Sequence, residues 1–370
     1  MSITLTYSLA DQDFKRTKSV GILNLSLHLL RHLASRDDIT SLTLLSNRTL
    51  ALEGAISEKI NVVDCDSAIS GRIARIGWDQ WGVYRAATRA GNEWLFLPKG
   101  FAPILLSPRF RVASYVHDTI HCFYRERYPS AMPLGELTYF HHCLRATLKH
   151  SRVIFTNSEF TRTGLEGVAR REGLKTPPVV VAGIGFEDPA VPWREKRDRI
   201  LLLASPWPNK RMDLAVDYLE RWRQLTGYPG VIDVVGGTPD GLAKPEGDTW
   251  RWLPRLDPAE FERRMSEARA LVYSSEFEGF GMPPVEAVLR GTCPVFSDIP
   301  ATREVMSGSG FAFSNDDFDS FTWAMNSALR ISSDRLEGWK RDLLARHHWD
   351  RVVSRVISGL EDHSSSMAIR

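Results

Sequence analysis

One stretch of the chain, residues 271–291, constrains the fold more than any other. It begins with an apolar run that predicts a buried strand, passes through a glycine-rich loop at 275–281, and ends in helix-forming residues. Pro283 and Pro284 stand at the expected helix start and Gly291 just past its end, where helices favour these residue types. Such strand–loop–helix units build parallel α/β sheets, which bind phosphorylated ligands where the loops leave the strands.

The same segment carries two carboxylates with seven residues between them. Glu278 lies in the loop, where it can face the reacting part of a ligand. Glu286 lies about one turn into the helix, where it can accept hydrogen bonds from vicinal hydroxyls. The alternative is a surface loop followed by an amphipathic helix whose acids are solvated.

The sequence from Glu278 to Ala287 is E-G-F-G-M-P-P-V-E-A. This segment resembles the signature of the retaining GT-B glycosyltransferases of family 4, a Glu, seven residues and a second Glu within E-G-F-G-x-P-x-x-E-A. The resemblance implies that Glu278 is catalytic and positions the donor sugar, and that Glu286 holds the ribose hydroxyls. It also assigns donor binding to the residues after Glu278, namely Gly279, Phe280, Gly281 and Met282.

Strand and helix patterns alternate along the rest of the chain, which predicts an α/β fold with mostly parallel sheets. A charged stretch with Pro and Trp, residues 188–199, interrupts the alternation as a domain linker. We therefore predict an N-terminal acceptor-binding Rossmann-like domain at 1–190 and a C-terminal nucleotide-sugar-binding Rossmann-like domain at 191–348. By the resemblance the two face a central cleft, and residues 349–370 form a helix that crosses back to the N-terminal domain, followed by a tail.

The loop after the first strand of the second domain contains a basic pair, Lys210 and Arg211. In the family this loop usually carries an arginine and a lysine that bind the donor diphosphate. Lys210 matches the family lysine, but Asn209 and Ser205 stand where the arginine is expected. Arg211 is the candidate substitute, because a guanidinium fork suits phosphate oxygens.

Two further positions match the family in the first half. His117 and Asp118 follow an apolar strand, and the resemblance implies that they line the acceptor side, with His117 also catalytic. Gly21 lies in the first strand-to-helix turn and is a candidate for contact with the donor diphosphate. The alternative for His117 is a structural residue whose hydrogen bonds are made within the fold. The alternative for Gly21 is an ordinary glycine at the start of a helix.

Composition excludes several other classes of protein. The net charge is +2, and residues 1–190 carry 23 Lys/Arg against 18 Asp/Glu, too small an excess for a nucleic-acid binder. That excess would suit contact with a membrane surface or an anionic lipid-linked acceptor, although a solvated face is the simpler explanation. The four cysteines are scattered, which favours reduced thiols. The absence of a long apolar run and of a signal-like start favours a cytoplasmic protein. We expect it to lie peripherally at the inner face of the membrane.

A D-x-D triplet, Asp64-Cys65-Asp66, suggests a metal-dependent enzyme, but its position lacks supporting context and we expect no metal and no cofactor.

The resemblance implies a retaining, metal-independent transferase whose co-substrate is GDP-mannose or another GDP-, dTDP- or UDP-hexose. The stretch 117–129, with Asp79 and Gln80 upstream, resembles O-antigen and capsule mannosyl- or rhamnosyltransferases. The expected acceptor is a glycan or lipid-linked oligosaccharide of bacterial surface polysaccharide or lipopolysaccharide synthesis. Two alternatives stay open: a UDP-sugar 2-epimerase-like enzyme and a catalytically silent nucleotide-sugar-binding partner.

Overall fold

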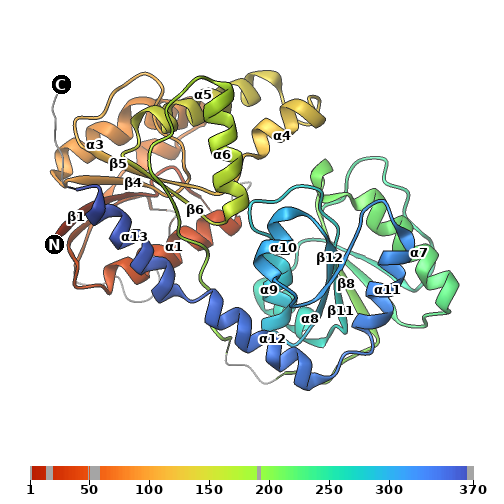
Figure 1. The fold of residues 1–370 in the computed structure, drawn as a ribbon. Coiled ribbons are helices and arrows are strands. Elements are labelled where there is room, and N and C mark those ends of the chain that lie inside the picture. Colours follow the sequence, from red (N-terminus) through yellow and green to blue (C-terminus); the bar gives the residue numbers. More distant parts are fainter. Residues whose placement is uncertain (1, 14–19, 49, 51–58, 190–192, 365–370) are drawn as a thin grey trace. The chain divides into compact units, whose positions relative to one another are not determined.

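The computed structural model describes residues 2–13, 20–48, 50, 59–189 and 193–364. The chain divides into two compact units (Figure 1). Unit 1 comprises Met1–Arg125, Met132–Gly185 and His347–Arg370, and unit 2 comprises Glu126–Ala131 and Phe186–Arg346. Residues 126–131 thus belong to unit 2, although residues of unit 1 flank them in the sequence. Residues 347–370 belong to unit 1, although they follow unit 2.

Unit 1 is built on a parallel sheet with the strand order β3-β2-β1-β4-β5-β6-β7. The strands are β1 (Ile3–Ser8), β2 (Ile39–Ser46), β3 (Ile60–Asp64), β4 (Trp94–Leu97), β5 (Arg111–Val116), β6 (Val153–Thr156) and β7 (Val179–Val181). The first strand pairs with β2 on one side and β4 on the other, so the strand order reverses between β1 and β4. The central strands are almost entirely buried, as expected for a parallel sheet covered on both faces.

The helical elements of unit 1 connect these strands. They are α1 (Val20–Ala34), η1 (Asp66–Ile69), α2 (Arg72–Gly77), η2 (Trp78–Gly82), α3 (Val83–Ala90), α4 (Ile120–Arg127), α5 (Leu134–His150), α6 (Glu159–Arg171) and α13 (Trp349–Asp362). The last helix, α13, packs against α1, β6 and β7. Gly359 allows this close approach, because a Cβ there would lie 2.7 Å from the Phe155 ring. The C-terminal helix thus joins the N-terminal strands, as predicted.

Unit 2 repeats this plan with the parallel strand order β10-β9-β8-β11-β12-β13. The strands are β8 (Arg199–Ala204), β9 (Val231–Gly236), β10 (Trp250–Leu253), β11 (Ala270–Tyr273), β12 (Cys293–Ser297) and β13 (Phe311–Phe313). The helical elements are η3 (Pro208–Lys210), α7 (Met212–Thr226), α8 (Pro258–Glu267), α9 (Met282–Leu289), α10 (Pro300–Met306), α11 (Phe318–Ala328) and α12 (Ser333–Arg346). Here the order reverses between β8 and β11.

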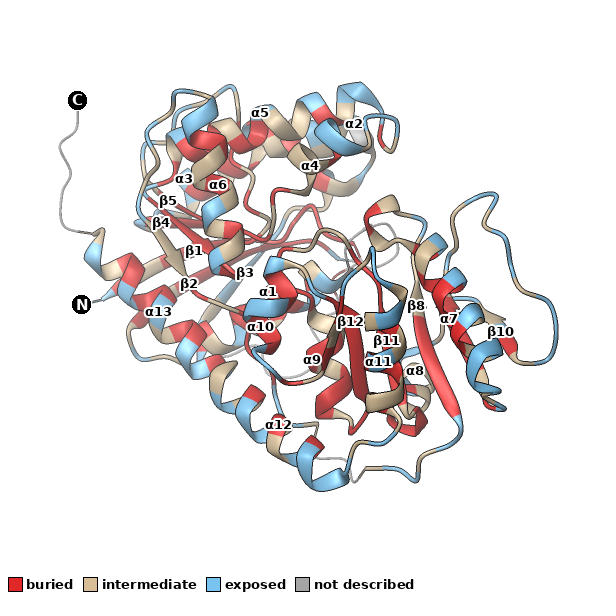
Figure 2. Cartoon of the chain, turned by 45° about the vertical axis from the view of Figure 1, so that its right-hand side comes forward, coloured by how far each residue is buried: buried red, intermediate tan, exposed pale blue. Residues whose placement is uncertain are grey.

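Buried residues concentrate on the strands and on the helix faces turned toward them (Figure 2). The predicted strand and helix at 271–291 are confirmed as β11 and α9, with Gly291 just past the helix. The pattern gave no sign of β10 and β13, which are only four and three residues long. No helix in the described part of the chain combines the length and apolarity needed to cross a bilayer.

Candidate active site

The predicted donor residues lie at the reversal point of the unit 2 sheet. The loop after β8 carries Lys210, and the loop after the neighbouring strand β11 carries Glu278. Open α/β sheets bind ligands outside the carboxyl ends of their strands at such a reversal. The topology therefore supplies a reason for these two side chains, distant in sequence, to meet.

Lys210 and Glu278 form an ion pair. The Lys210 ammonium also lies 3.1 Å from the Tyr273 hydroxyl and 5.2 Å from the centre of that ring. The side chains of Lys210 and Glu278 are 26% and 14% exposed, so the pair is sheltered but reachable. The sequence motif gave no indication that Tyr273, the last residue of β11, takes part.

The environment keeps Lys210 charged. Burial acts to lower the pKa of its ammonium, but the charge of Glu278 and the hydrogen bonds that the ammonium donates to Glu278 and Tyr273 outweigh that effect and raise the pKa. A cation that stays protonated in a sheltered site is suited to stabilising an anionic group such as a diphosphate.

Asn209 fastens the two loops together. Its side-chain amide donates to the Phe277 carbonyl at 3.0 Å, and its own carbonyl accepts from the Glu276 backbone N–H at 2.9 Å. Asn209 stands where the family arginine was expected, and here it is buried. Its amide fixes the spacing between Lys210 and Glu278, a role that the sequence did not reveal.

The glycine-rich loop has the conformation that its glycines permit. Gly281 has a φ of 86° and precedes α9 as its N-terminal cap residue, and a Cβ there would lie 2.9 Å from Thr302 Cγ2. Phe280 is buried, with its ring centre 6.2 Å from that of Phe186, and Gly279 is buried beside it. Met282 is the first residue of α9. The loop thus brings the backbone to the positive end of a helix, where anions bind favourably.

Glu286 lies in α9, about one turn beyond Gly281, and is half-buried. Burial raises the pKa of its carboxyl, while the Arg290 charge acts to lower it. The Arg290 guanidinium donates instead to Glu262 at 2.6 Å and to the Glu286 backbone carbonyl at 3.1 Å. The Glu286 carboxylate therefore keeps acceptor positions that ligand hydroxyls could use.

Arg211 lies next to Lys210 in sequence but has different partners. It has a φ of 44°, and its guanidinium lies 3.3 Å from Asp213 and 3.6 Å from Glu276. Two carboxylates thus neutralise Arg211, whereas Lys210 has one. To contact a diphosphate as predicted, the Arg211 guanidinium would have to leave Asp213 and Glu276 or bind the diphosphate in addition to them.

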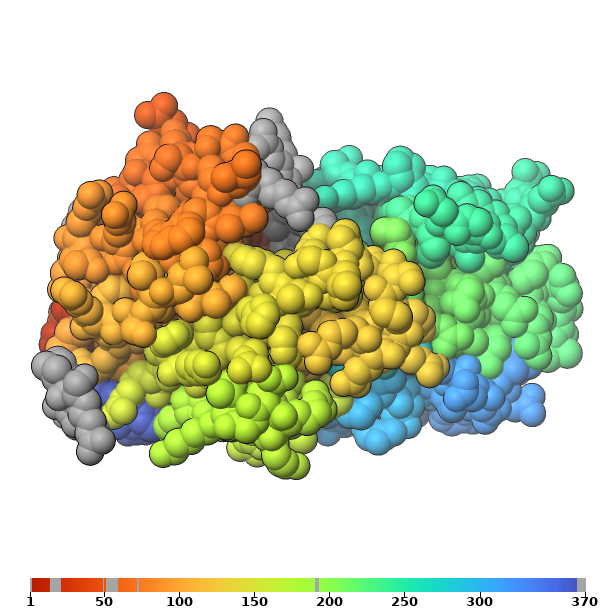
Figure 3. All heavy atoms as spheres, turned by 90° about the horizontal axis from the view of Figure 1, so that it is seen from above, coloured from red at the N-terminus to blue at the C-terminus, as the bar shows by residue number. Residues whose placement is uncertain are grey.

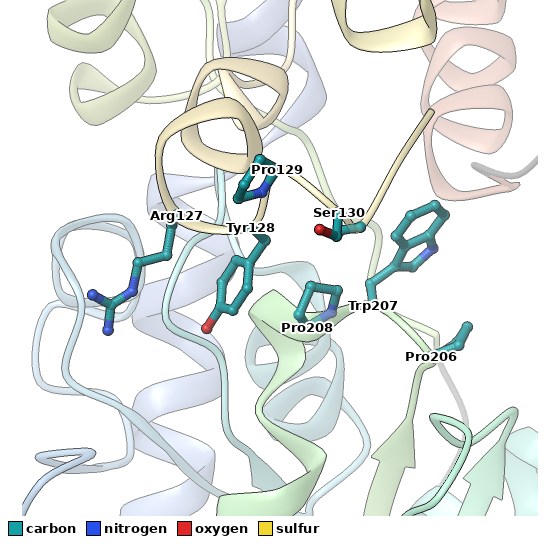
Figure 4. Close-up of a pocket in the computed structure, with 8 residues that line it drawn as sticks. Arg127, Tyr128, Pro129, Ser130, Pro206, Trp207 and Pro208 are labelled. Carbon is teal, nitrogen blue, oxygen red and sulfur yellow. The ribbon is translucent and has the colours of Figure 1, made fainter. Parts of the chain in front are cut away.

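A pocket of about 620 Å³ lies beside this loop within unit 2. It is lined by residues 127–131 and 206–208, which face each other across it (Figure 4). Tyr128 and Trp207 supply aromatic rings and Arg127 a positive charge. Aromatic rings and a few polar groups are common in small-molecule sites. This pocket was not predicted, because its two halves lie far apart in the sequence.

In unit 1, His117 follows β5 as predicted and is buried. Its Nε2 lies 2.7 Å from the Pro98 carbonyl oxygen, which can only accept, so Nε2 carries a proton. Burial lowers the pKa of His117, despite opposing effects of Pro98 and Asp118, and favours the neutral ring. Asp118 accepts from the Ile120 backbone N–H at 2.9 Å at the start of α4. His117 thus ties the end of β5 to the loop after β4, and Asp118 stabilises the turn into α4.

The remaining candidates are easily placed. Gly21, the candidate for contact with the diphosphate, is the exposed second residue of α1, and residues 14–19 before it lie outside the described residues. In the D-x-D triplet, Arg48 Nε lies 3.1 Å from Asp64 and 2.8 Å from Asp66. Both carboxylates of the triplet thus pair with the Arg48 guanidinium.

The sequence of unit 2 decides the family of this domain. Residues 186–341 match the family described as glycosyl transferases group 1. Unit 2 is a glycosyl transferases group 1 domain. Lys210, Glu278 and Glu286 all lie inside the matched residues, so the ion pair and the helical carboxylate belong to a glycosyltransferase domain.

A relative and two solved structures resemble the whole chain. The O-antigen chain mannosyltransferase RfbU of Salmonella typhimurium is 25% identical over 341 residues, which cover 89% of this chain and 92% of that protein. Sucrose-phosphate synthase from Thermosynechococcus elongatus superposes with a TM-score of 0.69 at 13% identity, covering 97% of this chain and 98% of its own. The Anabaena protein HepE, solved with UDP and glucose, gives a TM-score of 0.65 at 13% identity, covering 97% and 100%. The predicted GT-B fold, with two Rossmann-like domains on parallel sheets, is confirmed.

Proposed function

We propose that this protein is a retaining glycosyltransferase that moves a hexose from a nucleotide sugar to a glycan or lipid-linked acceptor. The observation that carries the proposal is the Lys210–Glu278 ion pair at the reversal point of a glycosyl transferases group 1 domain, with Glu286 about one turn into the helix that follows. A cation, two carboxylates and a helix N-terminus are the groups that a nucleotide sugar needs for its diphosphate and its hydroxyls.

In this mechanism Lys210 stabilises the negative charge that develops on the leaving diphosphate. The amino end of α9 and the backbone at 279–282 assist, Arg211 is the candidate second cation, and Glu286 accepts hydrogen bonds from the ribose. Glu278 holds Lys210 in place and positions the donor sugar. With cations and helix dipoles in these roles, we propose that the reaction needs no metal ion. His117 would line the acceptor side.

Retention of the anomeric configuration completes the proposal. The acceptor hydroxyl would attack the anomeric carbon on the face from which the diphosphate departs, and the leaving phosphate would take the hydroxyl proton. No protein nucleophile is then required, so Glu278 is given a positioning role and not a covalent one.

We propose mannose as the sugar and GDP-mannose as the donor. The support is the 25% identity to RfbU, which is named an O-antigen chain mannosyltransferase. A second protein, O-antigen chain mannosyltransferase B of Escherichia coli, is 27% identical over 142 residues. The acceptor would then be a growing surface-polysaccharide chain. The side chains of the loops do not by themselves fix the base, because backbone groups can read it. Other GDP-, dTDP- and UDP-linked hexoses are therefore part of the same proposal.

The first test is to titrate the purified protein with GDP-, UDP-, ADP- and dTDP-sugars in the presence of a chelator. Thermal shift and slow donor hydrolysis are followed together. We expect GDP-mannose to raise the unfolding temperature and to be hydrolysed slowly, in the wild type but not in Glu278→Ala. Binding without hydrolysis or transfer would favour a silent binding partner. Conversion of a UDP-sugar to its 2-epimer would favour the epimerase alternative.

We further propose peripheral contact of unit 1 with the inner face of the membrane. Ile73, Ile76 and Trp81, on α2 and η2, are 87%, 41% and 45% exposed. Arg85 and Arg89 follow Trp81 at intervals of four residues on α3 and are also exposed. Figure 3 shows orange residues, the colour of this part of the sequence, at the surface of unit 1. Apolar side chains beside arginines suit an anionic lipid surface.

A further inference from the structure

Unit 1 has a charged pair in the same topological position as the donor pair of unit 2. The unit 1 sheet reverses between β1 and β4, and the loops after these strands carry Asp11 and Lys99. Asp11 and Lys99 form an ion pair. In unit 2 the corresponding loops carry Lys210 and Glu278. Because ligands of open α/β sheets bind at the reversal, the Asp11–Lys99 pair marks a second candidate binding position.

The pair borders a small cavity. The cavity has a volume of about 20 Å³, and its walls include Ser8, Asp11, Trp78, Asp79, Lys99 and Phe101. The side chain of Asp11 is only 6% exposed and that of Lys99 is 33% exposed, so Lys99 is the more accessible partner. A space of this size admits one water molecule or one hydroxyl group, but not a whole sugar ring.

Asp79 adds a second carboxylate to the cavity wall. It accepts a hydrogen bond from the Tyr139 hydroxyl at 3.3 Å. Burial raises the pKa of Asp79 to about 6, while the Tyr139 hydrogen bond and the Arg75 charge act to lower it. A carboxylate has about four acceptor positions. Asp79 therefore has positions left for a ligand, at a site where its charge is only partly compensated.

The two loops that hold the pair are rigidly attached to the fold. The Asn47 side chain donates to the carbonyls of Ala10 and Gln12, both at 2.7 Å. Gly100 has a φ of 76°, and a Cβ there would lie 2.7 Å from the Tyr115 carbonyl oxygen. The Thr147 hydroxyl donates to the Gly100 carbonyl at 2.8 Å. Such support fixes Asp11 and Lys99 in place before any ligand arrives, which lowers the entropic cost of binding.

Fold stability alone gives little reason to place these charges here. Burying an ion pair costs desolvation free energy that its mutual attraction often only balances, so such pairs are weak stabilisers. A second carboxylate within the same wall adds a further cost. A polar ligand that both donates and accepts hydrogen bonds would compensate the Asp11, Asp79 and Lys99 charges.

We propose that Asp11, Asp79 and Lys99 form a hydroxyl-binding subsite for the acceptor sugar. This inference rests on the proposed glycosyltransferase function and assigns its acceptor specificity to named side chains. One sugar hydroxyl enters the cavity, whose walls include the Trp78 and Phe101 rings, donates to a carboxylate and accepts from Lys99. The three charged residues select among sugars by the position and orientation of that hydroxyl.

The test uses the full-length protein and a panel of methyl glycosides of mannose, galactose, rhamnose and N-acetylglucosamine. Ligand-detected NMR measures glycoside binding, and calorimetry measures GDP and GDP-mannose binding. We expect at least one glycoside to bind the wild type, and Asp79→Asn to weaken it about tenfold, the loss typical of one hydrogen bond to a charged group. The Kd of GDP should be the same in the variant and the wild type. Asp37→Asn, a fully exposed carboxylate of unit 1, serves as the matched control.

A pH series separates binding from a structural role. Asp79 is faced by Tyr139 and Arg75, with Cys143 nearby and Asp11 and Lys99 across the cavity. Protonation below about pH 6 removes its negative charge, so wild-type glycoside affinity should fall on acidification through that range. Asp79→Asn should show no such fall. The double variant Asp11→Asn/Lys99→Met removes both charges of the ion pair together and should also lose glycoside binding.

Equal glycoside affinity in the wild type and Asp79→Asn would overturn the subsite. So would the absence of binding of every glycoside to the wild type up to its solubility. If GDP-mannose still binds and is hydrolysed in these cases, the proposed function survives and only the subsite fails. If no nucleotide sugar binds, the proposed function itself fails.

Discussion

The ammonium of Lys210 and the carboxylate of Glu278 form an ion pair across 68 positions of sequence. Neighbouring parallel strands, β8 and β11, deliver the two loops to one edge of the unit 2 sheet. Asn209 then joins the loops through hydrogen bonds to residues 276 and 277. The pair is therefore a consequence of sheet topology, and its chemistry can be tested one side chain at a time.

Glu278→Gln should reduce the rate of sugar transfer by about 100-fold or more, the scale of losing one preorganised electrostatic group. The amide keeps the size of the side chain but leaves Lys210 without its negative partner. Steady-state kinetics with GDP-mannose measures the effect, and circular dichroism checks that the variant is folded. Near-normal turnover in a folded variant would remove Glu278 from the mechanism.

Lys210→Met should raise the Kd for GDP and GDP-mannose by at least about tenfold while changing the Kd for guanosine little, because only the diphosphate loses its cation. Arg211→Gln is the matched comparison. We expect a smaller rise for it, because Asp213 and Glu276 already neutralise the Arg211 guanidinium. Calorimetry of the three ligands on both variants distinguishes the cases. A larger effect at Arg211 would show that it leaves these partners and acts as the principal cation.

Glu286→Gln should weaken nucleotide and nucleoside binding alike, by about tenfold, because both ligands present ribose hydroxyls to this carboxylate. Burial raises the pKa of Glu286, so its charged form is lost on acidification sooner than that of an ordinary glutamate. Wild-type affinity for guanosine should therefore fall as the pH is lowered toward that raised pKa, and the variant should lack this fall. An unchanged pH profile in Glu286→Gln would contradict the ribose role.

Gly281→Ala should destabilise unit 2 by about 1–3 kcal/mol, the cost of holding a side chain in a left-handed conformation. Gly281 has a φ of 86°, and the added Cβ would lie 2.9 Å from Thr302 Cγ2. Urea unfolding measures the change. Gly338→Ala within α12 is the control, because a Cβ there meets nothing within 4 Å, and we expect it to be neutral or stabilising.

The double variant Ile73→Ser/Trp81→Ser should bind less to anionic phospholipid vesicles than the wild type, in a sedimentation assay at low salt. Both side chains are exposed in unit 1, at 87% and 45%, and the loss reflects apolar contact with the lipid interface. Added salt should weaken wild-type binding by screening the arginines. Trp323→Ser is the matched control, an exposed tryptophan of unit 2. Equal sedimentation of all three proteins would refute the membrane contact.

The sequence predicted what local pattern controls. The glycine and proline positions around 271–291 predicted the end of β11, the glycine-rich loop and α9, because helix starts and stops follow from residues within one turn. The cap of α6 is a local feature of the same kind, because the Ser158 hydroxyl accepts from the Thr161 backbone N–H at 3.1 Å. Alternating apolar runs likewise predicted two parallel-sheet domains.

The sequence by itself thus determined the alternation of strands and helices, the fold class and the identity of Lys210, Glu278 and Glu286 as candidates. Only the tertiary structure decided which side chains meet. It gave Lys210 a tyrosine partner, gave Arg211 two carboxylates, made Asn209 a clamp between loops, and joined Asp11 to Lys99. The physical reason is that backbone pattern is a property of neighbours in sequence, whereas these contacts join loops that only strand pairing brings to the same sheet edge.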